Sequence, residues 1–169
     1  MRKLDPLALD DFETQPFRLT ATAQLDADPI SVFAELRDPS LWFPLLYKSI
    51  WKTGATSGVG AEREVRLRTF GTFRERMLAW DEGERVAFTM VGTTSPLIDR
   101  MAEDWQVSRP GGASIYTQLT FSVYATPSMI GRAATPALKI ILRTLFNRAA
   151  TNLQKRAGTL KREHARKVS

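Results

Sequence analysis

The longest regular pattern of apolar positions lies near the C-terminus, between Leu138 and Leu160. Apolar residues recur there every three or four positions, with basic or amide residues mostly between them. That spacing is typical of one apolar stripe along an amphipathic helix. Thr135 suits the N-cap and Pro136 the first helical position, so we predict a helix from Pro136 to about His164. Such a helix would be roughly 40 Å long and would need a broad surface to pack against.

Alternating apolar and polar residues, typical of half-buried strands, occupy most of the chain before this helix. The first such strand is residues 17–27, and an Asp-Pro pair then starts a short helix over about residues 28–37. After a break at residues 38–40, residues 41–47 are predicted to form an aromatic-rich helical turn or loop. Further strands are predicted, between turns, at 49–53, 61–69, 72–80, 85–91, 100–108 and 113–125. Because the connections are short, successive strands should pair antiparallel.

The same alternation indicates which side chains of the sheet face the core. It leaves three charged residues on the inward face: Arg63, Glu75 and Glu103. Arg63 and Glu75 lie near strand ends, where an inward side chain can still reach water. Glu103 instead lies between Met101 and Trp105, which makes it the most unusual of the three.

Composition narrows the class of protein. A chain of 169 residues with 43% hydrophobic and 25% charged residues fits one soluble globular domain. It has no cysteine, which excludes disulfides and thiolate chemistry and fits a reducing compartment, so we expect a cytoplasmic protein. The N-terminal residues show no signal peptide, and no apolar run is long enough to span a bilayer.

The net charge of +6 is concentrated at the C-terminal end. Residues 148–169 hold seven basic residues and one acidic residue, so the first 147 residues are neutral. We interpret this segment as a solvated, frayed helix end. Alternatively, this basic segment could make a weak contact with an anionic membrane or with nucleic acid. Of these partners, we predict no nucleic acid.

Several kinds of chemistry are excluded by the residues present. The chain has one histidine, His164, in the basic tail, where we expect it to be exposed. A site with several histidine ligands is therefore excluded, a Ser-His-Asp triad is disfavoured, and we predict no metal. The glycines of residues 54–60 fit a hairpin turn rather than a phosphate-binding loop, because no Gly-Lys-Ser/Thr follows. We predict no cofactor.

The order of strand, short helices, antiparallel meander and long final helix resembles the START-like helix-grip superfamily (SRPBCC), most of all its polyketide cyclase/dehydrase and lipid-transport families. The resemblance covers residues 17–160 and rests on the segments 25–34, 38–44, 58–61 and 78–88. It implies an α+β fold in which a curved antiparallel sheet of about six or seven strands wraps around the C-terminal helix, with two short helices after the first strand. Residues 1–16 would then be an N-terminal arm and residues 161–169 a basic tail.

The resemblance also implies an apolar cavity between sheet and helix, opening beneath the short helices. The side chains we expect around it are Trp42, Trp51, Leu67, Met77, Phe88, Met90, Met101, Trp105, Leu119, Phe121, Leu138, Ile141, Leu142 and Leu145. The competing interpretation is that these residues simply fill a core. Several methionines on one concave face favour a cavity, because methionine adapts to loosely fitted ligands.

Two functions follow as hypotheses. In the first, the protein binds an apolar small molecule, such as a lipid or polyketide, as a carrier or sensor. In the second, it is a cyclase- or aromatase-type enzyme that uses Glu103 for acid–base catalysis, since burial would raise the pKa of that carboxyl. Against the second, Glu103 could instead pair with Arg63 or Arg68, or face water. The scarcity of polar groups on the expected cavity wall favours binding without chemistry.

Overall fold

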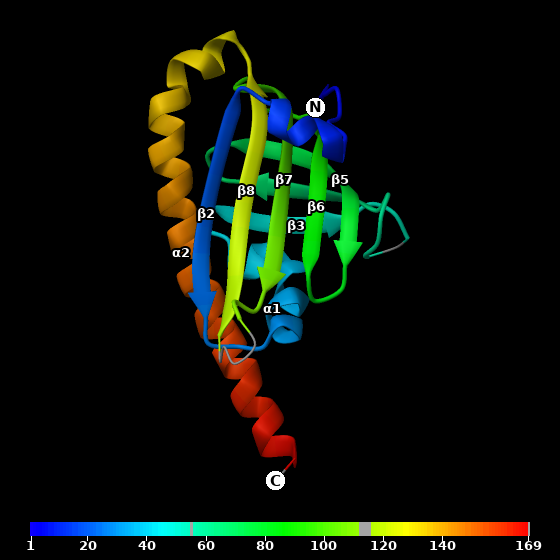
Figure 1. Cartoon of the computed structure of the whole chain (residues 1–169). Helices are drawn as coiled ribbons and strands as arrows, with labels where there is room; N and C mark the ends of the chain where they lie inside the picture. The colour runs from blue at the N-terminus through cyan, green and yellow to red at the C-terminus, as the bar shows by residue number, and fades with distance from the viewer. Residues whose placement is uncertain (55, 112–115, 169) are drawn as a thin grey trace.

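In the computed structural model, which describes residues 1–54, 56–111 and 116–168, a curved antiparallel sheet and one long helix form the domain (Figure 1). Side chains are described as far as residue 157. Within these residues the strands are β1 (Arg2–Lys3), β2 (Phe17–Leu25), β3 (Leu46–Trp51), β4 (Glu62–Leu67), β5 (Gly71–Asp81), β6 (Arg85–Thr93), β7 (Ile98–Ser108) and β8 (Thr117–Pro127). The helices are η1 (Leu9–Thr14), α1 (Pro29–Leu36), η2 (Pro39–Leu41) and α2 (Met129–Val168).

The sheet has the strand order β2-β8-β7-β6-β5-β4-β3, and β1 pairs with β6. It curls so strongly that β3 runs across behind β6–β8 in Figure 1. The helix α2 lies against β2 and β8 and contacts α1. The predicted α+β helix-grip architecture is confirmed, with α1 and η2 as two short helices after β2. The second of them lies mostly at the predicted break rather than in residues 41–47, and β3 begins at Leu46, inside that segment. The described sheet has one strand more than predicted, because Arg2 and Lys3 pair with β6.

The C-terminal helix begins earlier than predicted. It starts at Met129 rather than Pro136, and Ser128 caps it by accepting a hydrogen bond from the Gly131 N–H at 3.1 Å. Pro136 therefore lies inside the helix, where its missing N–H removes one backbone hydrogen bond and favours a bend. In Figure 1 the first turns of α2 run across the end of the sheet before the helix continues along it. The Thr-Pro start signal at residue 135 was misleading because an earlier cap was available.

The start of α2 is packed tightly against the connection between β6 and β7, and Gly131→Ala should destabilise the protein by about 2 kcal/mol. A Cβ at residue 131 would lie 1.9 Å from the Leu97 carbonyl oxygen, so the first turn of the helix would have to move away. Urea unfolding followed by circular dichroism measures the loss. Removing a helical glycine would otherwise stabilise a protein, so a gain in stability would contradict this packing.

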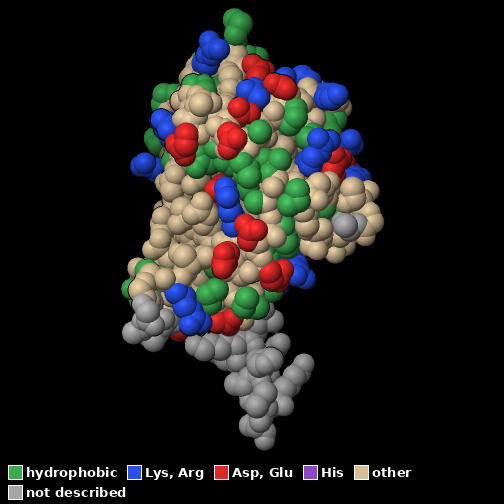
Figure 2. Space-filling model, turned by 45° about the vertical axis from the view of Figure 1, so that its right-hand side comes forward, with side chains coloured by type: hydrophobic (Ala, Val, Ile, Leu, Met, Phe, Trp, Pro, Cys, Tyr) green, Lys and Arg blue, Asp and Glu red, His purple; other side chains and the backbone are tan. Residues whose placement is uncertain are grey.

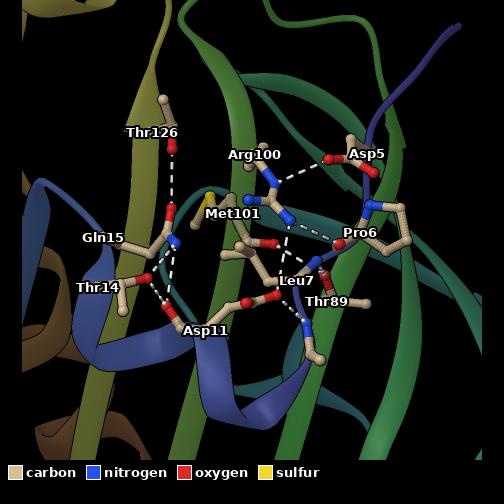
Figure 3. Close-up of polar contacts among 11 residues, drawn as sticks. Asp5, Pro6, Leu7, Asp11, Thr14, Gln15, Thr89, Arg100, Met101 and Thr126 are labelled. Carbon is tan, nitrogen blue, oxygen red and sulfur yellow. Dashed lines mark hydrogen bonds and ion pairs between the residues drawn. The ribbon is translucent and has the colours of Figure 1, made fainter.

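Residues 1–16 cover the face of the sheet that points away from α2. Leu7 and Phe12 are buried there against the small side chains Ala79, Ala87 and Ala102. Arg100 holds the segment in place, because its Nε lies 3.1 Å from Asp5 Oδ2 (Figure 3). The expected arm is thus an integral outer layer, whereas the opposite face of the sheet remains available for α2 and the main core.

Candidate functional site

An apolar pocket lies between the sheet and the first half of α2. Its cavity volume is about 110 Å³, which is several times the space that one buried water needs. The walls come from inward-facing residues of the sheet, from Pro39 and Phe43 near η2, and from α2 residues between Leu138 and Phe146. None of the pocket-lining residues comes from α1. The free space therefore lies nearer the start of α2 than the resemblance implied.

Eight of the fourteen residues predicted around a cavity line this pocket: Leu67, Phe88, Met90, Met101, Trp105, Leu138, Leu142 and Leu145. The other six do not: Trp42, Trp51, Met77, Leu119, Phe121 and Ile141. The resemblance implied the cavity, and most of the fourteen residues were placed on its wall by strand or helix periodicity. Periodicity identifies an inward face but not the part of that face that borders empty space.

A solid core beside the pocket, with Trp42 and Phe121 among its aromatic rings, accounts for four of the six. The Trp42 and Trp105 ring centroids are 5.5 Å apart, and the Phe121 and Phe146 rings stack at 5.0 Å. Met77 and Leu119 are buried in the same core. This end of the interior is thus the solid core that the competing interpretation described, while the other end is open.

The remaining two residues are placed differently. Trp51 is half-buried and lies over the Arg63 guanidinium, 5.3 Å from its carbon to the ring centroid, outside the pocket. Ile141 is 41% exposed. Leu138, Leu142 and Leu145 point inward, and Ile141 is rotated by about 100° from Leu142, so it faces solvent.

Pocket residues that the sequence analysis missed fall into two groups. Phe73, Val123 and Ala125 had a signal, because each lies at an inward position of its strand. Val65, Glu75 and Phe146 had the same kind of signal, from strand parity or from the helical stripe. The others lie at strand ends, in η2 or in connections, where periodicity is weak: Phe17, Pro39, Phe43, Leu46, Phe70, Ser95, Leu97, Ile98 and Pro127. Only the folded chain brings these positions together.

The polar part of the interior centres on Arg63, which is fully buried. Its Nε donates to Glu75 Oε2 at 2.7 Å, and its Nη1 donates to the backbone carbonyls of Leu36 and Arg37 at 3.4 and 3.3 Å. A cation is favourable there because the last carbonyls of α1 have no partner within the helix. Burial raises the pKa of Glu75, and the positive charge of Arg63 opposes that rise.

Glu103 is the second carboxyl in the pocket wall, and Arg63 is not its hydrogen-bond partner. The Trp105 Nε1–H donates to Glu103 Oε2 at 2.8 Å, and the side chain faces the pocket. Burial, and then the nearby negative charge of Glu75, raise the pKa of Glu103 to about 8, against the opposing effects of Trp105 and Arg63. At pH 7 this side chain is therefore mostly a neutral carboxylic acid with an O–H to donate.

Neither a cluster of metal-binding side chains nor a membrane-spanning helix is present in the part of the chain that the structure describes. No cluster there of three or more histidine, cysteine, aspartate or glutamate residues could hold a metal ion. Nor does any helix in that part have an apolar stretch long enough to cross a bilayer. The predicted exposure of His164 concerns a side chain outside the described ones.

Comparison with known proteins agrees with the fold. The family described as polyketide cyclase / dehydrase and lipid transport matches residues 16–158. An uncharacterized protein of Mycobacterium tuberculosis is 28% identical over 153 residues, which cover 88% of this chain and 87% of that protein.

Two solved structures are similar in fold. A START superfamily protein from Mycobacterium smegmatis has a TM-score of 0.68 at 13% identity and covers 85% of this chain and 98% of its own. A protein from Thermobifida fusca has a TM-score of 0.66 at 20% identity and covers 85% of this chain and 94% of its own. Because the family match extends over nearly the whole chain, this protein belongs to the polyketide cyclase/dehydrase and lipid-transport family.

Proposed function

We propose that the protein binds an apolar small molecule, such as a lipid or a polyketide, in the pocket between the sheet and α2, and acts as its carrier or sensor. The observation that supports this most is the composition of the pocket wall. Apart from the Trp105 indole, the lining residues with polar side chains in the described chain are Glu75, Ser95 and Glu103. A ligand there would be held mainly by burial of apolar surface, at about 25 cal/mol per Å².

Glu103 would determine the orientation of such a ligand. A neutral carboxylic acid donates one hydrogen bond, which suits a carbonyl or hydroxyl oxygen on an otherwise apolar molecule. The rest of the wall around it consists of side chains such as Met90, Met101 and Leu142. Specificity would then come from the single hydrogen bond that the Glu103 carboxyl donates at a fixed position in the pocket. We expect this role in the cytoplasm, on the basis of the cysteine-free sequence.

Native mass spectrometry of the protein purified from cells tests the proposal, with an apolar molecule expected to co-purify. Leu142→Trp should remove that molecule, because the larger side chain would occupy the pocket. Thr144→Trp is the matched control, since Thr144 is exposed on the same helix. Ligand-free wild-type protein, or equal occupancy in both tryptophan variants, would contradict the proposal.

The pH dependence of binding provides a second measurement. Filling the pocket with an apolar dye, such as N-phenyl-1-naphthylamine, removes water from around Glu103 and so favours its neutral form. Dye affinity should therefore be constant below the pKa of about 8 and fall as the pH rises through it. Glu103→Gln should bind the dye at neutral pH and lose the pH dependence.

A second candidate is a cyclase-type enzyme, and the raised pKa of Glu103 favours it. The ionised carboxylate could accept a proton from the carbon next to a substrate carbonyl, and the fraction of carboxylate grows as the pH approaches 8. With a poly-β-keto thioester as substrate, Glu103→Gln should abolish cyclisation and leave dye binding at neutral pH unchanged. Wild-type protein that binds the thioester without converting it would favour the carrier.

A further inference from the structure

The side of α2 that points away from the core is apolar over its first turns. Exposed fractions there reach 86% for Met129, 63% for Ile130 and 70% for Ile140. Ala133 and Ala137 are exposed between them at helical spacing. We call this surface the outer apolar face; it consists of Met129, Ile130, Ala133, Ala137, Ile140 and Ile141. A single exposed apolar side chain needs no explanation, but a contiguous strip of them marks an interaction site.

The outer apolar face is bordered by basic side chains. Arg132, Lys139 and Arg143 are exposed. Arg132 precedes Pro136, and Lys139 and Arg143 lie one turn apart after it, with the Lys139 Nζ 5.7 Å from the Phe17 ring centroid. The sequence has no aspartate or glutamate between Asp104 and Glu163. By contrast, acidic and basic side chains are intermixed on the face of the molecule in Figure 2, where the β5 side of Figure 1 is turned forward.

We propose that this outer face of the first half of α2 docks on an anionic lipid bilayer. An amphipathic helix that carries aliphatic residues on one side and basic residues along its flank lies in the interface of such a membrane. A second copy of the chain is a poorer partner, because an isologous contact would bring two equally basic faces together. An anionic surface matches both the apolar and the charged residues.

The docking position also fits the proposed function, on which this extension rests. The same helical segment lines the pocket with Leu138 and Leu142 on its other side. The pocket would therefore lie next to the bilayer, where apolar molecules are concentrated. The site differs from the basic tail that the sequence singled out as a weak membrane contact, since it lies some 20 residues earlier in the chain.

Vesicle co-sedimentation tests the proposal, with vesicles of phosphatidylcholine alone and of an equimolar mixture with phosphatidylglycerol. The wild-type protein should sediment with the mixed vesicles and remain in solution with phosphatidylcholine alone. The double variant Ile130→Gln/Ile140→Gln should bind the mixed vesicles about tenfold more weakly, because two apolar side chains no longer enter the membrane. Arg132→Gln/Arg143→Gln should weaken binding by a similar factor, and the loss should grow at low salt.

Matched controls separate this face from other surfaces. Val59→Gln removes an exposed apolar side chain from the connection between β3 and β4, and Arg74→Gln/Arg109→Gln removes two exposed charges elsewhere. These variants, and deletion of Lys161–Ser169, should sediment as the wild type does. The proposal is overturned if the wild type does not bind the mixed vesicles, if the deletion alone abolishes binding, or if Ile130→Gln/Ile140→Gln only converts a dimer to a monomer.

Dye uptake and vesicle binding, measured on the same proteins, test the carrier function and the docking face separately. Purified Ile130→Gln/Ile140→Gln should still take up the apolar dye, because neither side chain lines the pocket. Dye uptake without vesicle binding by the wild type would leave the carrier function standing and reject the docking face. Vesicle binding without dye uptake would reject the carrier function and keep the docking face.

Discussion

Glu103→Gln should weaken the pH dependence of stability between about pH 4.5 and 8. The Glu103 carboxyl has an ordinary pKa of 4.5 and a pKa of about 8 in the folded protein. In that range the folded state binds more protons than the unfolded state, so the free energy of unfolding of the wild type falls as the pH rises. The stabilisation is complete below pH 4.5 and is lost by about pH 8, with a loss on the order of 5 kcal/mol at most.

Urea unfolding at intervals from pH 5 to pH 9 measures this effect. A slope of the same sign should remain in Glu103→Gln, because burial also raises the pKa of Glu75. Glu84→Gln is a suitable control, since Glu84 is exposed and its replacement removes an equal charge. Parallel curves for the wild type and Glu103→Gln would show that the Glu103 carboxyl reaches water in the folded protein.

Arg63→Met should destabilise the protein by about 3–5 kcal/mol. The substitution keeps a long apolar side chain beside the Trp51 and Phe88 rings. It leaves the Glu75 carboxyl, which is only 4% exposed, without its cation. It also removes the hydrogen bonds to the last carbonyls of α1, so that helix should lose its anchor on the sheet. Urea unfolding at pH 7 measures the change.

A double-mutant cycle shows how much of this loss comes from the stranded carboxylate. Adding Glu75→Gln to Arg63→Met should recover a substantial part of the stability, because no charge is then buried alone. Arg74→Met is the control, because Arg74 is exposed and precedes Glu75 in β5; it should change the free energy of unfolding by less than about 0.5 kcal/mol. Purely additive losses for Arg63→Met and Glu75→Gln would mean that the ion pair contributes no coupling.

Strand parity was the most reliable part of the sequence analysis. It placed Arg63, Glu75 and Glu103 on the inward face, and the structure has all three there. Parity depends only on the two-residue repeat of a strand, so it can be counted along the chain. Parity could not predict which carboxylate forms the ion pair with Arg63. Arg63 and Glu75 are paired across β4 and β5, whereas Glu103 lies beyond β6, and that arrangement follows from strand order and register.

Helix phase was less reliable. Ile141 was assigned to the apolar stripe but is exposed. The helix α2 has more apolar residues than can pack against the sheet, so some of them face solvent. A helix with aliphatic residues on two sides gives an ambiguous pattern. Only contact with β2 and β8 selects the inner side, and the unselected side becomes the outer apolar face.

The sequence by itself determined the antiparallel meander, the long final helix and the inward charged residues, because each depends on local period and short connections. The helix-grip class came from the resemblance of this order of elements to a known superfamily. Only the tertiary structure decided where the interior remains empty, that α2 begins at Met129, and that Glu103 has a tryptophan rather than an arginine as its partner. These features depend on how side chains distant in sequence share space. A cavity is the volume that packing leaves unfilled, and no single segment of the chain specifies it.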